Sequence, residues 1–215
     1  MIVKVCGVRT AEVAEVAVAA GADWIGIVFE PRSPRFAGDG EARAVVDAVG
    51  RSADVVGVFV EPSVEECEQA AERYRLAAVQ VHGEVAPDFV ERCSVPVIRG
   101  INATSPAELL QMQWWPDGFV LIDGAPEDGG LPGGTGSRVD VRTAAEVARH
   151  RRIVLAGGLG PDSVAEAIGM VAPYGVDASG GLERERGVKD PALVGAFVRA
   201  ARGAFASLAR DGSAA

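Results

Sequence analysis

The chain has 215 residues, of which 48% are hydrophobic and 24% charged, a composition typical of a compact folded protein and not of a disordered chain. Its formal net charge of -9 disfavours nucleic acid as a partner, because phosphate backbones are held by an excess of Lys and Arg. No secretory leader is visible, and Gly or charged residues interrupt the apolar runs before they reach membrane-spanning length. Three cysteines without paired spacing predict no disulfide framework. We therefore expect a cytoplasmic protein with neither a nucleic acid nor a membrane as partner.

Short apolar runs rich in β-branched residues recur along the chain. Almost every position within a run is apolar, which is typical of parallel strands covered on both faces. The eight predicted strands are Ile2–Cys6, Trp24–Phe29, Val55–Val60, Ala77–Val81, Val95–Arg99, Phe119–Asp123, Arg152–Ala156 and Gly175–Ala178.

Amphipathic stretches with helix start and stop signals separate these runs. The signals are Thr10 as an N-cap with Gly21 at the stop, capping-box spacing at Ser63 and Glu66 and at Ser105 and Glu108 with Pro106 between them, Asp162 in the first turn after Pro161, and Asp190 ahead of Pro191. Trp114, Trp115 and Pro116 leave room only for a short or irregular fifth helix. Eight strand–helix repeats favour a closed (β/α)8 barrel over an open doubly wound sheet, with residues 1–215 forming one domain.

Reactive side chains occur at the predicted strand ends, where the active site of such a barrel lies. Cys6 closes the first strand, and Asp123 closes the sixth. A nearby cation or helix N-terminus can lower the pKa of a thiol, and desolvation raises the pKa of a carboxyl group. Taken alone, a buried Cys is often a small core residue, and an Asp before Gly is often a turn former. Their shared position favours a catalytic pair, with Cys6 as base and Asp123 as acid, suited to isomerising a sugar.

Two glycine turns follow the seventh and eighth predicted strands. The first contains Gly157 and Gly158, and the second contains Ser179, Gly180 and Gly181. Turns at these positions of a barrel commonly bind a phosphate through backbone N–H groups and a short helix N-terminus. Isolated glycine pairs usually make only tight turns, but two pairs at these two positions favour a phosphate site.

Other candidates lie in loops at the same end of the predicted barrel. Residues 128–136 form a Gly-rich segment that is either a water-excluding lid or disordered. Arg35 follows two prolines and can pair with a carboxylate, although most such Arg side chains are only solvated. His82 is a candidate for substrate binding, although a lone His is more often a structural hydrogen-bonding residue. With two His in the chain no metal site is expected, and no nucleotide or redox-cofactor motif is visible.

Distinctive short sequences run in order along almost the whole chain. They are Lys4–Gly7, Gly21–Asp23, Phe29–Arg35, Gly57–Val60, Val79–Gly83, Gly133–Gly136, Ala156–Leu159 and Gly187–Pro191. In this combination the chain resembles the phosphoribosylanthranilate isomerase family of tryptophan biosynthesis. The resemblance implies a (β/α)8 barrel that acts on a small phosphorylated substrate. Either a monomer or a homodimer fits such an acidic barrel.

The resemblance also implies a reaction and the roles of single residues. The reaction is the Amadori rearrangement of N-(5-phosphoribosyl)anthranilate to 1-(2-carboxyphenylamino)-1-deoxyribulose 5-phosphate. Asp123 would protonate the ribose ring oxygen, and the Cys6 thiolate would then remove the proton from the adjacent carbon. Arg35 would hold the anthranilate carboxylate, and the two glycine turns would hold the phosphate.

Three positions depart from the family pattern. Ser137 stands where the family usually has Lys, Gly180 replaces the second of two serines, and Glu61 stands where Asn is usual. None of them touches Cys6 or Asp123, so the predicted chemistry is kept, while lid closure and substrate preference stay open. Two alternatives follow: an aldose–ketose isomerase for another aminoaldose phosphate, and a catalytically silent phosphosugar-binding barrel.

Overall fold

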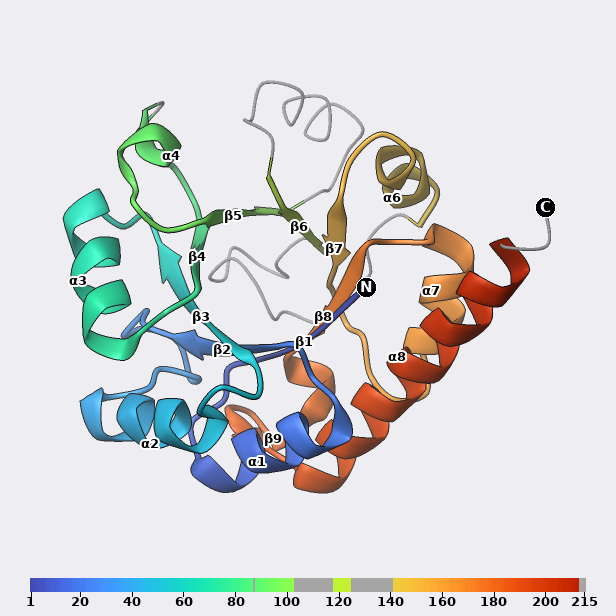
Figure 1. The fold of residues 1–215 in the computed structure, drawn as a ribbon, viewed down its shortest axis with the longest axis horizontal. Coiled ribbons are helices and arrows are strands. Elements are labelled where there is room, and N and C mark those ends of the chain that lie inside the picture. The colour runs from blue at the N-terminus through green and yellow to red at the C-terminus, as the bar shows by residue number, and fades with distance from the viewer. Residues whose placement is uncertain (87, 103–117, 125–140, 213–215) are drawn as a thin grey trace.

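The computed structural model describes residues 1–86, 88–102, 118–124 and 141–212. Eight parallel strands close into a barrel in the order β1 to β8, and β8 pairs with β1 to complete the ring. Figure 1 shows this ring of strands at the centre, with the helices arranged around it. The predicted fold class is confirmed.

The strands of the barrel are β1 (Ile2–Cys6), β2 (Trp24–Val28), β3 (Asp54–Val60), β4 (Ala78–His82), β5 (Val97–Asn102), β6 (Val120–Asp123), β7 (Ile153–Leu155) and β8 (Gly175–Ala178). The helices are α1 (Ala11–Ala20), α2 (Asp39–Val49), α3 (Val64–Tyr74), α4 (Phe89–Arg92), α6 (Val141–Ala148), α7 (Val164–Val171) and α8 (Pro191–Gly212). Every predicted strand is present, with small shifts at some ends. The predicted short or irregular fifth helix falls on residues 103–117, which lie outside the described part of the chain.

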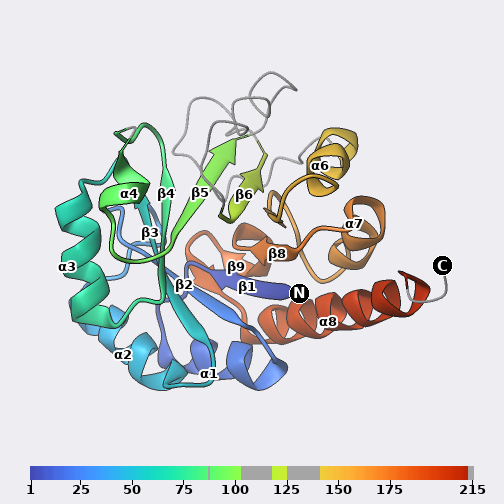
Figure 2. The ribbon, with the colours of Figure 1, turned by 45° about the horizontal axis from the view of Figure 1, so that its top comes forward.

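A short 3-10 helix and a hairpin follow β8 and were not predicted from the sequence. They are η3 (Gly180–Leu182), β9 (Glu183–Glu185) and β10 (Val188–Lys189), with β9 and β10 antiparallel. Figures 1 and 2 place β9 on the side of the barrel where β1 and β8 meet. This hairpin contributes two charged side chains to the barrel mouth, as described below.

Several helix boundaries follow the local signals in the sequence. The Thr10 hydroxyl accepts a hydrogen bond from the Val13 N–H, and Gly21 ends α1 in the left-handed region at a φ of 100°. Ser63 and Glu66 form the predicted capping box of α3. One start differs: α7 begins at Val164, so Asp162 lies in the turn before the helix and not in its first turn. The signals at Ser105, Pro106 and Glu108 lie outside the described residues.

Strand side chains alternate between the outside and the inside of the barrel, because successive residues of a strand point to opposite faces. Outward side chains such as Val3, Val5 and Ile25 pack against the helices in the main core. A separate inner cluster lies within the barrel and consists of Trp24, Val56, Ala78, Ile98, Leu121, Val154 and Ala156. One step further toward the strand ends, the interior becomes polar, with Lys4, Gln80 and Asp177 all buried.

Helix α8 is long and apolar enough to cross a membrane by length and composition alone. It lies along the outside of the barrel beside α1 and α7 (Figure 2). Its side chains buried there are Val194, Phe197, Val198, Ala201 and Phe205. Packing against the outside of the barrel therefore buries these apolar side chains of the helix.

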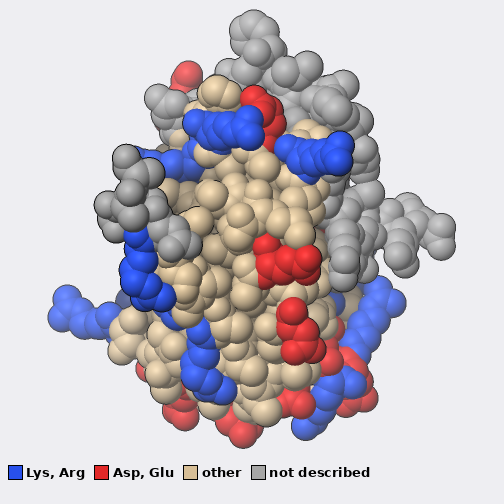
Figure 3. All heavy atoms as spheres, turned by 90° about the vertical axis from the view of Figure 1, so that its right-hand side faces the viewer, with Lys and Arg blue, Asp and Glu red and all other residues tan. Residues whose placement is uncertain are grey.

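The surface shown in Figure 3 is the right-hand side of the view in Figure 1. On this face, Lys and Arg side chains lie apart from one another around a broad uncharged area, and Asp and Glu side chains lie among them. A nucleic acid ligand needs a continuous basic surface, and the described residues on this face do not form one.

Candidate active site

Three of the predicted site residues are the last residues of barrel strands. Cys6 ends β1, His82 ends β4 and Asp123 ends β6, so all three lie at the C-terminal mouth of the barrel. They are 7%, 2% and 3% exposed. One oxygen of Asp123 accepts a hydrogen bond of 2.7 Å from the N–H of Gly124. The fold thus brings a thiol, an imidazole and a carboxyl group to one end of the barrel, each largely shielded from water.

A buried ion pair lies one step below Cys6 in the barrel. The Nζ of Lys4 on β1 is 3.1 Å from Oδ1 of Asp177 on β8, and the two side chains are 0% and 7% exposed. Gly26 on β2 leaves room for this arrangement, since a Cβ there would lie 2.9 Å from Cys6 Sγ and 3.2 Å from Lys4 Nζ. The thiol and the ammonium group therefore occupy the same small part of the interior.

The electrostatic surroundings of Cys6 act in opposite directions. Burial raises the pKa of the thiol, and the charge of Lys4 is the strongest influence that lowers it. Asp177 raises this pKa further, Lys189 lowers it, and the net direction is upward. The cation expected from the sequence is present, but burial outweighs it. For Lys4, burial lowers the pKa, yet attraction to Asp177 and Cys6 keeps it raised, so the side chain stays a cation.

His82 is held as a neutral imidazole. Burial, with the nearby charges of Lys4 and Arg99, lowers the pKa of His82 to about 3. Its Nε2 is 2.7 Å from Nε2 of Gln80, while its Nδ1 has no hydrogen-bond partner among the described residues. The ring occupies the space beside Gly100 on β5, where any Cβ would collide with it. The imidazole is thus neutral, and its Nδ1 is shielded from solvent as well as unpartnered among the described residues.

Arg35 is not a solvated side chain but part of a buried ionic network. Its Nε and Nη2 donate to the two carboxylate oxygens of Glu183, at 2.6 and 3.1 Å. The Nζ of Lys189 is 2.7 Å from Glu183 and 3.4 Å from the hydroxyl of Ser179. Burial opposes ionisation of Glu183, but the hydrogen bonds from Arg35 and Lys189 hold the pKa of its carboxyl group below the usual value.

The stem of Arg35 lies directly on the residue after Cys6. Gly7 has a φ of 74°, and a Cβ there would be 2.8 Å from Cδ of Arg35. Gly187 in the β9–β10 hairpin approaches the carbonyl of Pro34 too closely for any side chain. These two glycines let the loop after β2 pack between the end of β1 and the hairpin, which brings Arg35 to the mouth beside Cys6.

The two glycine turns expected to bind phosphate contact each other. Gly157 and Gly158 adopt φ values of 90° and 64°, in the region that favours glycine. A side chain at Gly181 would collide with the carbonyl of Leu159, so the turn after β8 packs against the turn after β7. Through its contact with Ser179, Lys189 also brings a positive charge to the second turn. The sequence-based prediction invoked only backbone donors here, and it did not include Lys4, Asp177, Glu183 or Lys189.

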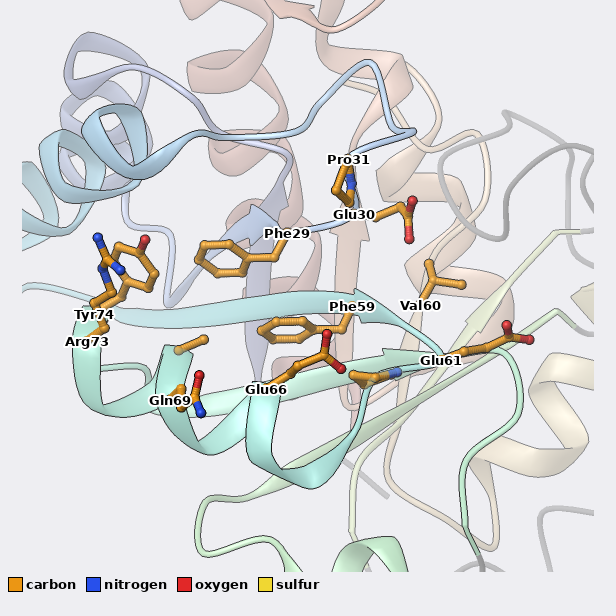
Figure 4. A pocket seen from close by; sticks show the side chains of 12 residues that line it. Phe29, Glu30, Pro31, Phe59, Val60, Glu61, Glu66, Gln69, Arg73 and Tyr74 are labelled. Atoms are coloured by element: carbon orange, nitrogen blue, oxygen red, sulfur yellow. The ribbon is translucent and has the colours of Figure 1, made fainter.

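A separate cavity of about 350 Å³ lies beside β3 and α3, outside the predicted site (Figure 4). The ring of Phe29 stacks on Phe59 and Tyr74, with centroids 5.2 and 5.1 Å away. Of the carboxylates that line it, Glu30 pairs with Arg32 and Glu66 caps the Ser63 N–H. Because its aromatic rings pack on one another and two of its three lining carboxylates, all but Glu61, are already paired, we assign it no function.

No group of three or more His, Cys, Asp and Glu side chains is placed to hold a metal ion within the described residues. Residues 128–136, predicted to be a lid or a disordered segment, and the departure at Ser137 lie outside the described part of the chain.

Comparison with known proteins gives one consistent family. The family model for N-(5'-phosphoribosyl)anthranilate (PRA) isomerase matches residues 3–200. The chain is 39% identical over 202 residues to the N-(5'-phosphoribosyl)anthranilate isomerase of Geotalea uraniireducens, covering 94% of this chain and 98% of that one. It is 40% identical over 196 residues to the isomerase of Syntrophomonas wolfei, covering 91% and 95%.

Solved structures give the same result. The phosphoribosylanthranilate isomerase from Thermotoga maritima matches with a TM-score of 0.85 at 31% identity, covering 94% of this chain and all of that chain (100%). A phosphoribosylanthranilate isomerase in complex with reduced 1-(o-carboxyphenylamino)-1-deoxyribulose 5-phosphate matches with a TM-score of 0.83 at 29% identity, covering 94% and 100%.

Proposed function

The chain belongs to the N-(5'-phosphoribosyl)anthranilate isomerase family, and we propose that the side chains at its barrel mouth carry out this isomerisation by acid–base catalysis. The protein is an aldose–ketose isomerase of tryptophan biosynthesis. Its substrate is N-(5-phosphoribosyl)anthranilate, and its product is 1-(2-carboxyphenylamino)-1-deoxyribulose 5-phosphate. Every step is a proton transfer or a rearrangement within the substrate, so the proposed chemistry needs neither a metal nor a redox cofactor.

Asp123 starts the reaction as the general acid. It donates a proton to the ribose ring oxygen, the bond from that oxygen to C1 breaks, and the nitrogen lone pair forms an iminium with C1. The position of Asp123 supports this role, because a carboxyl group that is 3% exposed at the mouth can reach substrate while bulk water is excluded.

Cys6 continues the reaction as the general base. Its thiolate removes the proton from C2, the electrons of that C–H bond form a double bond to C1, and the iminium becomes a neutral enolamine. Tautomerisation of the enolamine then gives the ketose. Cys6 and Asp123 end β1 and β6, which are three places apart around the eight-stranded ring, so the two side chains reach the mouth from different sides and a substrate can lie between them.

The remaining candidates bind the substrate. Arg35 pairs with the anthranilate carboxylate, as its fixed position beside Gly7 supports. The turns containing Gly157, Gly158, Ser179, Gly180 and Gly181 bind the phosphate through backbone N–H groups. The closeness of Lys189 to Ser179 adds a favourable charge for this anion. His82, which ends β4 at the mouth, is assigned to the sugar or to its ring-opened form.

The observation that carries this proposal is the joint burial of Cys6 and Asp123 at strand ends of a barrel that matches the family over nearly its whole length. The test is turnover of phosphoribosylanthranilate by the purified protein, followed by loss of the substrate's fluorescence. Saturable turnover is expected. Turnover restricted to another aminoaldose phosphate would favour the first alternative, and binding of the substrate without turnover would favour the silent phosphosugar-binding barrel.

We place the protein in the cytoplasm, as one domain that spans residues 1–215. One structural relative, from Thermotoga maritima, is described as dimeric. For this chain, a monomer or a homodimer stays the prediction, and sedimentation equilibrium measures which of the two forms.

A further inference from the structure

The acid–base proposal leaves a buried ion pair unused. Lys4 and Asp177 lie inside the barrel, 3.1 Å apart, with side chains 0% and 7% exposed. Neither Nζ of Lys4 nor Oδ1 of Asp177 has a well-directed hydrogen bond within the described residues. The ammonium group is therefore neutralised by its partner but still has N–H donors to offer to a further acceptor.

Stability alone is a weak reason for these charges. Removing an ammonium and a carboxylate from water is costly, and replacing such a pair by well-packed apolar side chains is often neutral or stabilising. The inner cluster below the pair, which includes Trp24, Leu121 and Val154, is wholly apolar. An apolar residue at Lys4 would extend this cluster, so the charge needs another explanation.

The location of the ion pair beside Cys6 explains the buried charge. Lys4 and Cys6 are two residues apart on β1 and point to the same side of the strand, into the barrel. The space left by Gly26 is bordered by both Cys6 Sγ and Lys4 Nζ. A sulfur that becomes negatively charged during catalysis would thus have an ammonium group as its immediate neighbour.

We propose that Lys4, held in place by Asp177, is the positioning residue that stabilises the thiolate form of Cys6. This inference rests on the proposed role of Cys6 as the base. When the S–H bond ionises, its electron pair stays on sulfur, the proton passes to water, and Lys4 remains protonated throughout. Asp177 fixes the ammonium group and keeps it charged. A buried Lys without such a partner would lose its proton more easily.

Other charged groups act on Cys6 from the neighbouring elements. Asp177 on β8 opposes the thiolate, and Lys189 on β10 favours it. Lys189, however, lies 2.7 Å from Glu183, which also neutralises Arg35. Lys4 is the larger favourable influence on the thiol, so it is the residue to test.

The test is the rate of Cys6 alkylation by iodoacetamide as a function of pH, since only the thiolate reacts. Peptide mass spectrometry separates Cys6 from Cys67 and Cys93. In Lys4→Met, the apparent pKa of Cys6 is expected to rise by one unit or more, which makes alkylation at least about tenfold slower at any pH below both values. Gln80→Met is the matched control, because it replaces a buried but uncharged interior side chain, and it should leave the profile unchanged.

A second variant allows the same test if Lys4→Met does not fold. Lys4→Met/Asp177→Asn removes both charges and leaves no buried ion without a partner, and it too should alkylate more slowly than wild type. An unchanged or faster Cys6 reaction in a folded variant that lacks Lys4 would overturn the inference. Failure of the base assignment is a separate result: it would appear as turnover retained in Cys6→Ser, whatever the alkylation profile of Lys4→Met.

Discussion

At the scale of single residues, Cys6 is a small buried side chain that we propose as the catalytic base. Cys6→Ser preserves the size of the side chain, but a hydroxyl is far too weak a base near neutral pH. We expect a folded variant whose turnover is lower by orders of magnitude in the fluorescence assay. Cys93→Ser, which changes a half-buried thiol at the end of α4, is the matched control and should keep wild-type turnover. Near-normal turnover in a well-folded Cys6→Ser protein would exclude Cys6 as the base.

Replacing Asp123 and replacing Arg35 should impair turnover in different ways. Asp123→Asn keeps the shape but cannot donate the proton that opens the ring, so kcat should collapse while KM changes little. Arg35→Ala deletes a charge-assisted hydrogen bond already made in the bound state, which is worth roughly 1.5–3 kcal/mol, so KM should rise about ten- to a hundredfold. Steady-state kinetics of both variants checks this. The reverse pattern would mean that the two roles are exchanged.

At the scale of elements, the end of α7 contains an unfavourable backbone conformation. Ala172 caps this helix with a φ of 48°, in the left-handed region, and its N–H donates to the carbonyl of Ile168. Glycine adopts this region without the steric cost of a Cβ. Ala172→Gly is therefore expected to raise the free energy of unfolding by about 1 kcal/mol in urea titration. Ala206→Gly, at an exposed site inside α8, is the control and should lower it by about 1 kcal/mol.

The β9–β10 hairpin has a separate role, because its Glu183 anchors Arg35. Glu183→Gln keeps the size of the side chain but removes the charge that binds both Arg35 and Lys189. We expect KM to rise about tenfold with a smaller change in kcat, since the loss concerns binding before the transition state. Glu185→Gln changes an exposed carboxylate on the same hairpin and should leave both constants unchanged. A fall in kcat alone would show that Glu183 acts on the chemical step instead.

At the scale of the whole molecule, the polar interior makes the stability of the barrel depend on pH. The pKa of His82 is about 3 in the folded state and 6.5 for an ordinary His, so the unfolded chain binds a proton first as the pH falls. Above pH 6.5 His82 is neutral in both states and does not change the free energy of unfolding. Below pH 6.5 this residue lowers the free energy of unfolding by about 1.4 kcal/mol per pH unit. Urea titrations from pH 7 to pH 5 should show this slope.

His82→Gln provides the comparison for that measurement. A Gln side chain does not titrate, so the part of the slope between pH 6.5 and pH 5 that comes from His82 should disappear, even if the variant is less stable at pH 7. Identical slopes in the two proteins would mean that His82 is charged in the folded barrel.

The elements of the fold follow from local sequence. Strands such as β2 and β7 are continuous apolar runs because the helices cover one face and the barrel interior the other. The caps at Thr10 and Ser63 involve side chains and N–H groups three residues apart, so spacing alone predicts them. Cys6 and Asp123 could be identified for the same reason, since a residue that ends a barrel strand lies at the mouth whatever its distant neighbours are.

The partners of the site residues depend on the closed barrel. Lys4 and Asp177 meet because β8 pairs with β1, and Arg35 meets Glu183, 148 positions away in sequence, because the hairpin after β8 folds back over the loop after β2. The sequence contains no local signal for such pairs, since Lys, Arg, Asp and Glu side chains are most often exposed. Local sequence determined the eight strands of the barrel and the capped starts of α1 and α3, but not the hairpin after β8. Only barrel closure decided which charges were brought out of water together, because that depends on contacts between segments far apart in the chain.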